Sequence, residues 1–204
     1  DSLLKCADIA MYHAKKTGKN RFEIYVPEMG MMTAAELCVA VGYAIDHGEL
    51  ALEYQPKVCA RTRQITGVEA LVRWDHPSLG RLAPNQWIPT IAHSPVMERL
   101  GEWTIAKAID DHGRWTRAGL EFSVAVNIGA RHFSNQTFTT SLARIAADKN
   151  FDCRDMEIEI TEDTLFSSDG LAGEVLDALH RLGFRISIDD FGTGYSNIAR
   201  LGQM

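Results

Sequence analysis

Cysteine is scarce in this chain, and the copies it has lie far apart. The 204 residues include four cysteines, at positions 6, 38, 59 and 153, and no two of them form a Cys-x-x-Cys pair. Cysteine zinc sites and disulfide frameworks need more closely matched spacings, so the sequence predicts neither. This usage fits a reducing compartment, and we expect the protein to be cytoplasmic.

Long apolar runs and an excess of basic residues are also lacking. No stretch of the sequence approaches the roughly 20 apolar residues of a membrane helix, so we expect no membrane segment in this chain. A full-length protein could still be tethered to a membrane through a region outside it. The formal net charge of -6 argues against binding of a nucleic acid polymer through a broad basic face. A small anionic ligand remains compatible, because a few local cations or metals can hold one.

The first part of the chain contains too few elements to form a core. Residues 3–17 have the apolar spacing of a helix, and residues 22–25 read as a short strand that stops at Pro27. A helix and one strand cannot bury a core. We therefore expect residues 1–26 to be the remnant of a preceding domain and residues 27–36 to be a linker. We also expect the natural protein to continue beyond both ends of this sequence.

From residue 37 onward, strand and helix patterns alternate. After a helix that ends at Gly48, the expected strands are 51–58, 65–73, 121–128, 156–161 and 184–189, and the expected helices are 84–93, 97–118, 138–148 and 171–182. This alternation predicts an α/β fold with a mostly parallel sheet and helices outside it. Five strands suit an open doubly wound sheet, whereas a closed eightfold barrel would need three more.

Acidic and amide side chains occur in four of the expected strands or at their ends. They are Glu69, Asn127, Glu159 and the pair Asp189 and Asp190. A carboxylate among apolar residues is costly to bury unless a cation or several donors compensate it. Sites in parallel α/β proteins are built at the carboxyl ends of the strands. An oxygen-rich pocket there suits Mg²⁺ or Mn²⁺, and two such metals are a common device for phosphoester hydrolysis.

Ordinary structural explanations exist for the same residues. A single glutamate in a strand is more often solvated or paired with an arginine, and an Asp-Asp pair before a glycine-rich turn is usually turn chemistry. Spacing leaves the metal site and the solvated rim equally open.

Five ordered segments across about 140 residues decide between these explanations. They are Gln55-Pro56-Lys57, Glu69-Ala70-Leu71-Val72-Arg73-Trp74, the stretch around Asn127, Glu159-Ile160-Thr161-Glu162, and Asp189-Asp190-Phe191-Gly192-Thr193-Gly194-Tyr195-Ser196. Together they resemble the motifs of the EAL domain family. Upstream, residues 7–15 and 18–21 resemble the last helix and strand of a GGDEF diguanylate cyclase domain. The Gly-Gly-Asp-Glu-Phe segment itself is absent, so we expect no cyclase activity in this chain.

The resemblance implies an incomplete (β/α)8 TIM-like barrel and a metal-dependent phosphodiesterase. Such an enzyme hydrolyses cyclic di-GMP to linear pGpG in bacterial second-messenger signalling. By motif, the first Mg²⁺ or Mn²⁺ would be held by Glu69, Asn127, Glu159 and Asp189. Asp189 would bridge to a second metal, which Asp190 would help to bind.

The remaining motif residues are expected to act on the ligand or on the loop. Arg73 would contact a phosphate, for which a guanidinium is well suited, and Gln55 is a further candidate for a ligand contact. Glu162 would position the loop 190–197. The family's later lysine, glutamate and glutamine would lie beyond Met204. A degenerate EAL domain that acts as a receptor or interaction module is the alternative function, and a homodimer through the EAL domain is plausible.

Overall fold

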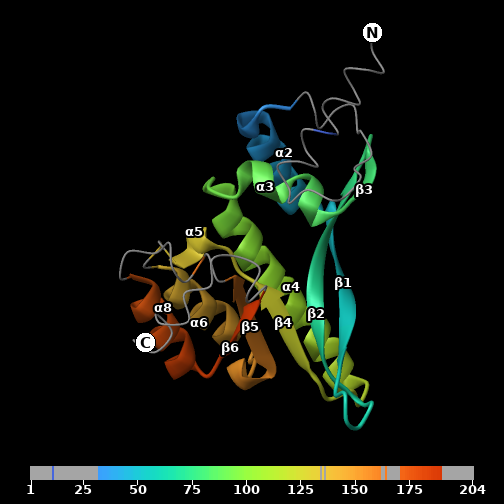
Figure 1. Ribbon diagram of the computed structural model, residues 1–204, viewed down its shortest axis with the longest axis vertical. Helices are drawn as coiled ribbons and strands as arrows, with labels where there is room; N and C mark the ends of the chain where they lie inside the picture. The colour runs from blue at the N-terminus through green and yellow to red at the C-terminus, as the bar shows by residue number, and fades with distance from the viewer. Residues whose placement is uncertain are drawn as a thin grey trace.

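One mixed sheet organises the part of the chain that the structure describes. The computed structural model describes residues 11, 32–133, 135, 137–161, 164 and 171–189. The expected elements before residue 32 and the loop after Asp189 therefore lie outside the described residues. Within them the strand order is β1-β2-β4-β5-β6, and β3 pairs with β2 (Figure 1). The strands are β1 (Leu50–Val58), β2 (Ile65–His76), β3 (Gly80–Leu82), β4 (Ser123–Asn127), β5 (Met156–Thr161) and β6 (Arg185–Asp189).

The expectation of a mostly parallel sheet is confirmed, with two exceptions. Strands β2, β4, β5 and β6 are parallel, whereas β1 and β3 are both antiparallel to β2. Figure 1 shows β1 and β2 running together as a long hairpin. The short link between them has no glycine or proline, and its Arg63 takes a left-handed φ of 60°. This link therefore carries no residue that signals a turn, and β3 is too short to show a pattern.

The longer helices occur as expected except over residues 84–93, and the sequence did not predict the short helices at 130–133 and 153–155. The helices are α2 (Ala34–His47), η1 (Pro84–Gln86), α3 (Ile88–Ile91), α4 (Val96–Arg117), α5 (Ala130–Phe133), α6 (Phe138–Asp148), η2 (Cys153–Asp155) and α8 (Leu171–Leu182). The single helix expected over 84–93 is wrong, because η1 and α3 divide it at Trp87. Pro89 lacks the N–H that a continuous helix would need there, and it fits the first turn of α3. Pro95 then separates α3 from α4.

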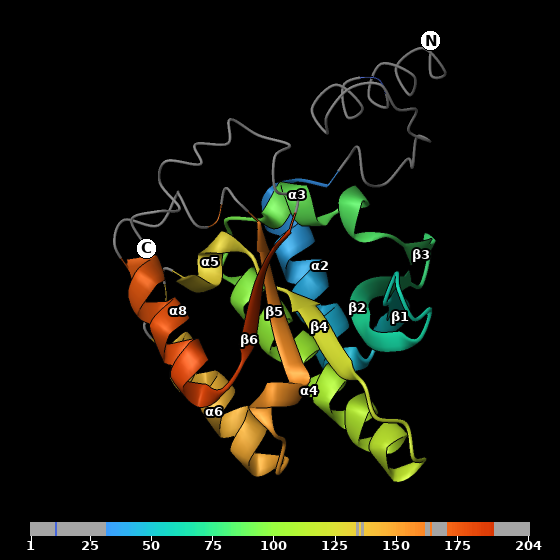
Figure 2. The same cartoon turned by 60° about the horizontal axis from the view of Figure 1, so that its bottom comes forward.

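Apolar residues on one face of the sheet pack against α4, α6 and α8. Alternate residues of β5, namely Met156, Ile158 and Ile160, are buried there with Ile105 of α4 and Leu179 of α8. Figure 2 shows these helices gathered along one side of β4, β5 and β6. Because successive strand residues point to opposite faces, the residues between these apolar positions belong to the other face.

That other face is polar. Along β5 it carries Glu157 and Glu159, and the parallel register places Ser187 of β6 and Asn127 of β4 beside Glu159. Parallel sheets are normally apolar on both faces, with helices over each, or closed into barrels. A polar face opposite the helix layer is therefore where a site can be built.

A second core supports the far end of the β1–β2 hairpin. Trp74 of β2 meets Trp87 edge to face, with ring centroids 5.5 Å apart, and α2 covers them through Leu37 and Val41. Helix α2 begins with a capping box in which Thr33 and Glu36 satisfy each other's backbone N–H groups. In the described ranges, no helix is both long and apolar enough to cross a membrane.

Candidate functional site

Strand register brings the predicted site residues of β1, β2, β4 and β5 onto the polar face. Gln55 of β1 lies opposite Glu69 of β2, and Asn127 of β4 lies opposite Glu159 of β5. Glu69 pairs with Ala125, two residues before Asn127 on the same face. Residues that are distant in sequence are thereby placed on adjacent strands.

Glu69 and Asn127 are in direct contact. The Asn127 side-chain nitrogen donates a hydrogen bond to Glu69 Oε1 at 2.7 Å. Amide and carboxylate are therefore held together at the carboxyl end of β4, which is the arrangement expected when both serve one ligand. Gln55 is exposed on the neighbouring strand, so its side chain is accessible from the same face.

Glu159 is the most deeply buried carboxylate of this face, with 7% of the residue exposed. Its partner is Lys57 of β1, whose ammonium contacts Glu159 and also lies 3.4 Å from Glu157 Oε1. Burial raises the pKa of Glu159, the Lys57 ammonium opposes this rise, and the neighbouring charges of Glu69 and Glu157 add to it. This part of the face therefore stabilises positive charge. The sequence motif that contains Lys57 assigns it no role, although its alternation with Gln55 places it on the same face.

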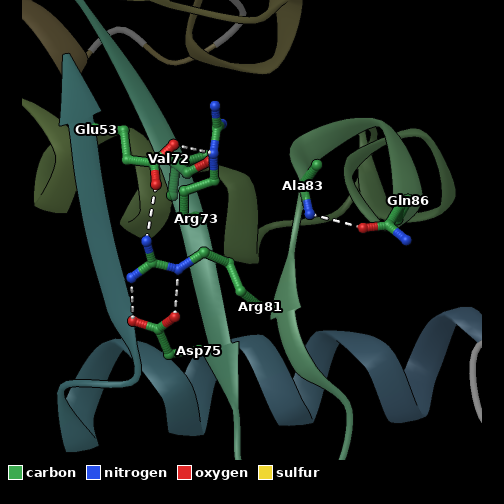
Figure 3. A network of polar contacts seen from close by, with 7 residues as sticks. All are labelled: Glu53, Val72, Arg73, Asp75, Arg81, Ala83 and Gln86. Carbon is green, nitrogen blue, oxygen red and sulfur yellow. Dashed lines mark hydrogen bonds and ion pairs between the residues drawn. The ribbon is translucent and has the colours of Figure 1, made fainter.

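Arg73 lies further along β2 and is held by two contacts (Figure 3). Its Nε donates to Glu53 Oε2 at 2.7 Å, and its Nη1 donates to the Val72 carbonyl oxygen at 2.9 Å. Its side chain is 19% exposed. The guanidinium thus lies on the site face, as a phosphate contact would require. Its partner Glu53 was not singled out from the sequence.

The structure places the remaining predicted residues only in part. Asp189 is the last residue of β6, opposite Thr161 of β5, so its backbone is two strands from Asn127. Asp190 and Glu162 lie outside the described residues. Within the described ranges, no three His, Cys, Asp or Glu side chains converge on a point that could hold a metal ion.

The donor chemistry nevertheless fits a hard divalent cation. Glu69, Asn127 and Glu159 offer carboxylate and amide oxygens, with which Mg²⁺ and Mn²⁺ are compatible. A cationic group, the Lys57 ammonium, already lies against Glu159. The face thus combines oxygen ligands with negative charge that a bound cation would stabilise.

His132 supports the backbone beside this face. Because the Gly129 carbonyl can only accept, His132 Nδ1 carries the proton and donates to it over 3.2 Å. The imidazole is 1% exposed, and its Nε2 has no partner among the described residues. Burial lowers the pKa of His132, so the ring is neutral. Asn127, Gly129 and His132 also line a cavity of about 190 Å³ against α4.

Comparison with known proteins assigns the family. The family model of the EAL domain matches residues 39–204. Over 204 residues the chain is 34% identical to the cyclic di-GMP phosphodiesterase PdeR of Escherichia coli K12, covering 99% of this chain and 31% of PdeR. It is 32% identical over 201 residues to the bifunctional diguanylate cyclase/cyclic di-GMP phosphodiesterase MucR of Pseudomonas aeruginosa, covering 97% of this chain and 29% of MucR.

Solved structures agree. The phosphodiesterase PaMucR in complex with c-di-GMP matches with a TM-score of 0.76 and 32% identity, covering 83% of this chain and 69% of that one. The EAL enzyme Bd1971, bound to cAMP and cyclic di-GMP, matches with a TM-score of 0.73 and 31% identity, covering 84% and 48%. The chain spans about a third of the length of the curated relatives PdeR and MucR. Its fold, its motifs and these matches show that the chain belongs to the EAL domain family.

Proposed function

We propose that this chain belongs to an EAL domain that hydrolyses cyclic di-GMP to linear pGpG in a bacterial signalling protein. The observation that carries the proposal is the contact between Glu69 and Asn127 beside Glu159, on the polar face of the sheet. The likeness to PdeR and to the ligand-bound PaMucR domain supports the same reaction. A domain that retained only the fold would have no need for acids and an amide gathered on one face.

Mg²⁺ or Mn²⁺ is the proposed cofactor, in a two-metal site. Glu69, Asn127, Glu159 and Asp189 would hold the first ion, and Asp189 and Asp190 the second. Bound there, the ions would activate water and offset charge on the leaving oxygen. Burial of Glu159 supplies a carboxylate whose charge is poorly compensated by water, which strengthens its attraction for a cation. Lys57 would compensate that charge in the absence of metal.

Ligand binding is assigned to the cationic and amide groups of the same face. Arg73 would bind a phosphate through the N–H groups that Glu53 and Val72 leave free, because a guanidinium has five donors. Gln55, exposed opposite Glu69, would contact the ligand from β1. Glu162 would position the loop 190–197.

The fold and domain organisation extend this proposal. The exposed polar face suits the interior of a (β/α)8 barrel that β1 to β6 begin and later strands would close. We place the EAL domain at residues 37–204, a linker at 27–36 and the end of a GGDEF domain at 1–26. The name of MucR, a bifunctional cyclase and phosphodiesterase, supports this tandem order.

The test is hydrolysis of cyclic di-GMP by the natural full-length protein with Mg²⁺ or Mn²⁺. Glu69→Gln keeps the shape of the side chain and removes its charge. We expect pGpG production to fall at least about 100-fold, since groups that only support metal ligands already cost 10–100-fold. Glu174→Gln, the same change on the exposed side of α8, should leave the rate unchanged. Binding of cyclic di-GMP by the wild type without any hydrolysis would refute the enzyme and identify a receptor.

A further inference from the structure

Four charged side chains of alternating sign form a continuous chain across β1, β2 and β3. Glu53 of β1 accepts hydrogen bonds from Arg73 of β2 and from Arg81 of β3, each at 2.7 Å. Arg81 in turn binds Asp75 of β2 through two parallel bonds of 2.7 and 3.0 Å. Figure 3 shows the Glu53 carboxylate between the two guanidinium groups.

Register explains why these four residues meet. Asp75 and Arg81 are directly opposite each other on β2 and β3. Glu53 lies opposite Leu71, which makes Arg73 its diagonal neighbour two residues along the same face. Both oxygens of Glu53 are therefore engaged, and the carboxylate is fixed from two sides.

The network differs from an ordinary surface ion pair. An isolated exposed pair contributes little, because two long side chains must be ordered in water. Here the Arg81–Asp75 bridge is bidentate and holds the Arg81 guanidinium in one orientation. Arg81 in turn holds the Glu53 carboxylate. At the inner end of the chain, Arg73 is 19% exposed, whereas Glu53, Asp75 and Arg81 are 45%, 47% and 52% exposed. The least exposed residue of the network is thus Arg73, the residue proposed to bind a phosphate.

The geometry leaves Arg73 with free donors in a fixed direction. One of its five N–H groups points to Glu53 and another to Val72, so three have no partner among the described residues. Glu53 accepts from Nε, and no described residue accepts a hydrogen bond from Nη2. Glu53 therefore orients the guanidinium without blocking it.

We propose that Glu53 is a positioning residue that holds Arg73 in place for a phosphate of the substrate, with Arg81 and Asp75 holding Glu53 in turn. The proposal rests on the proposed hydrolysis of cyclic di-GMP. Glu53 would act on substrate binding and not on the chemical step, because Arg73 contacts the phosphate in the ground state as well as in the transition state.

Glu53→Gln tests this, since it keeps the size of the side chain and removes the charge that orients Arg73. In the purified full-length protein we expect the KM for cyclic di-GMP to rise about 3- to 10-fold, with kcat changed less than about 2-fold. Asp46→Asn is the matched control. It removes one exposed carboxylate from a 2.7 Å pair with Arg99, between α2 and α4, and should leave KM unchanged.

A double-mutant cycle separates positioning from general stability. If Glu53 acts through Arg73, Glu53→Gln should change KM in the wild type but not in an Arg73→Gln background. An equal rise in both backgrounds would mean that Glu53 acts elsewhere. A fall in KM would mean that its carboxylate competes with the ligand. Either result overturns the proposal.

Failure of the proposed function would be recognised separately. If the wild type produces no pGpG, the side-chain NMR resonance of Arg73 Nε–H still reports the contact with Glu53. The dissociation constant of cyclic di-GMP in EDTA reports the binding effect. Positioning requires that Glu53→Gln shift that resonance and weaken binding about 3- to 10-fold. An unshifted resonance or unchanged binding overturns the inference even in a protein without catalysis.

Discussion

Helix α4 passes so close to His132 that one added methyl group makes a decisive test. A Cβ atom on Gly101 would lie 2.1 Å from His132 Nε2 and 2.7 Å from its Cε1. The imidazole is held where it lies, because it is buried, bonded to the Gly129 carbonyl and packed against Phe138 with ring centroids 4.8 Å apart. Gly101→Ala should therefore force a shift of the ring or of the helix.

The expected magnitude follows from two opposing effects. Overpacking a filled core costs about 1–3 kcal/mol, and a contact of 2.1 Å belongs in the upper part of that range. Replacing a mid-helix glycine by alanine returns about 1 kcal/mol. The net loss is about 1–2 kcal/mol, which lowers the Tm of a protein of this size by about 2–8 °C.

The same helix provides the control. At Gly113 an added Cβ would meet only the tip of Arg117, at 3.6 Å, so Gly113→Ala should raise the free energy of unfolding by up to about 1 kcal/mol. Urea unfolding followed by tryptophan fluorescence measures both variants. In a His132→Ala background the penalty at Gly101 should disappear. If Gly101→Ala stabilises the protein as Gly113→Ala does, the contact with His132 is not as described.

Two further predictions concern titratable groups on or beside the site face. Burial lowers the pKa of His132, so the unfolded chain takes up the proton first as the pH falls. The stability that this group contributes is therefore complete above about pH 6.5 and is lost as the pH falls below it. The charges of Glu98 and Glu102 of α4 act on the ring in the opposite direction and moderate the loss. The urea midpoint should therefore fall more between pH 7.5 and 5.5 in the wild type than in His132→Gln, and an equal fall would contradict this reasoning. Lys57→Met removes the ammonium from Glu157 and Glu159, and because Lys57 is 35% exposed we expect a loss of about 1–2 kcal/mol, less than for a fully buried pair. Differential scanning calorimetry should show a lower Tm that Mg²⁺ partly restores, whereas an unchanged Tm would show that the pair contributes nothing.

The sequence predicts the elements whose periodicity is set by burial. Strand β5 and helices α6 and α8 occur at the expected residues, because each has one face in the core and its apolar residues repeat accordingly. The segment 84–93 also has apolar residues at suitable positions, but backbone chemistry at Pro89 overrides them. The antiparallel entry of β1 was missed because Arg63, and not a glycine, takes the left-handed conformation in its turn.

Side-chain alternation predicts which residues share the site face, but not which of them touch. Glu69, Asn127 and Glu159 share that face because each lies at the proper position in its strand. The contact between Lys57 and Glu159 joins residues 102 positions apart, and no local pattern contains it. Likewise, Glu53 meets Arg73 diagonally, so their contact depends on a strand register that the sequence does not show.

The alternation along β5 also has an evolutionary consequence. Met156, Ile158 and Ile160 hold the helix layer, while Glu157 and Glu159, between them, face the site. Fold maintenance and the proposed chemistry thus depend on the same six-residue strand, but on alternating positions. A substitution scan of β5 should alternate from one residue to the next, with losses of protein abundance at one set of positions and losses of the proposed hydrolysis at the other. A lineage could therefore abandon catalysis through changes at the second set and keep a stable scaffold for other uses.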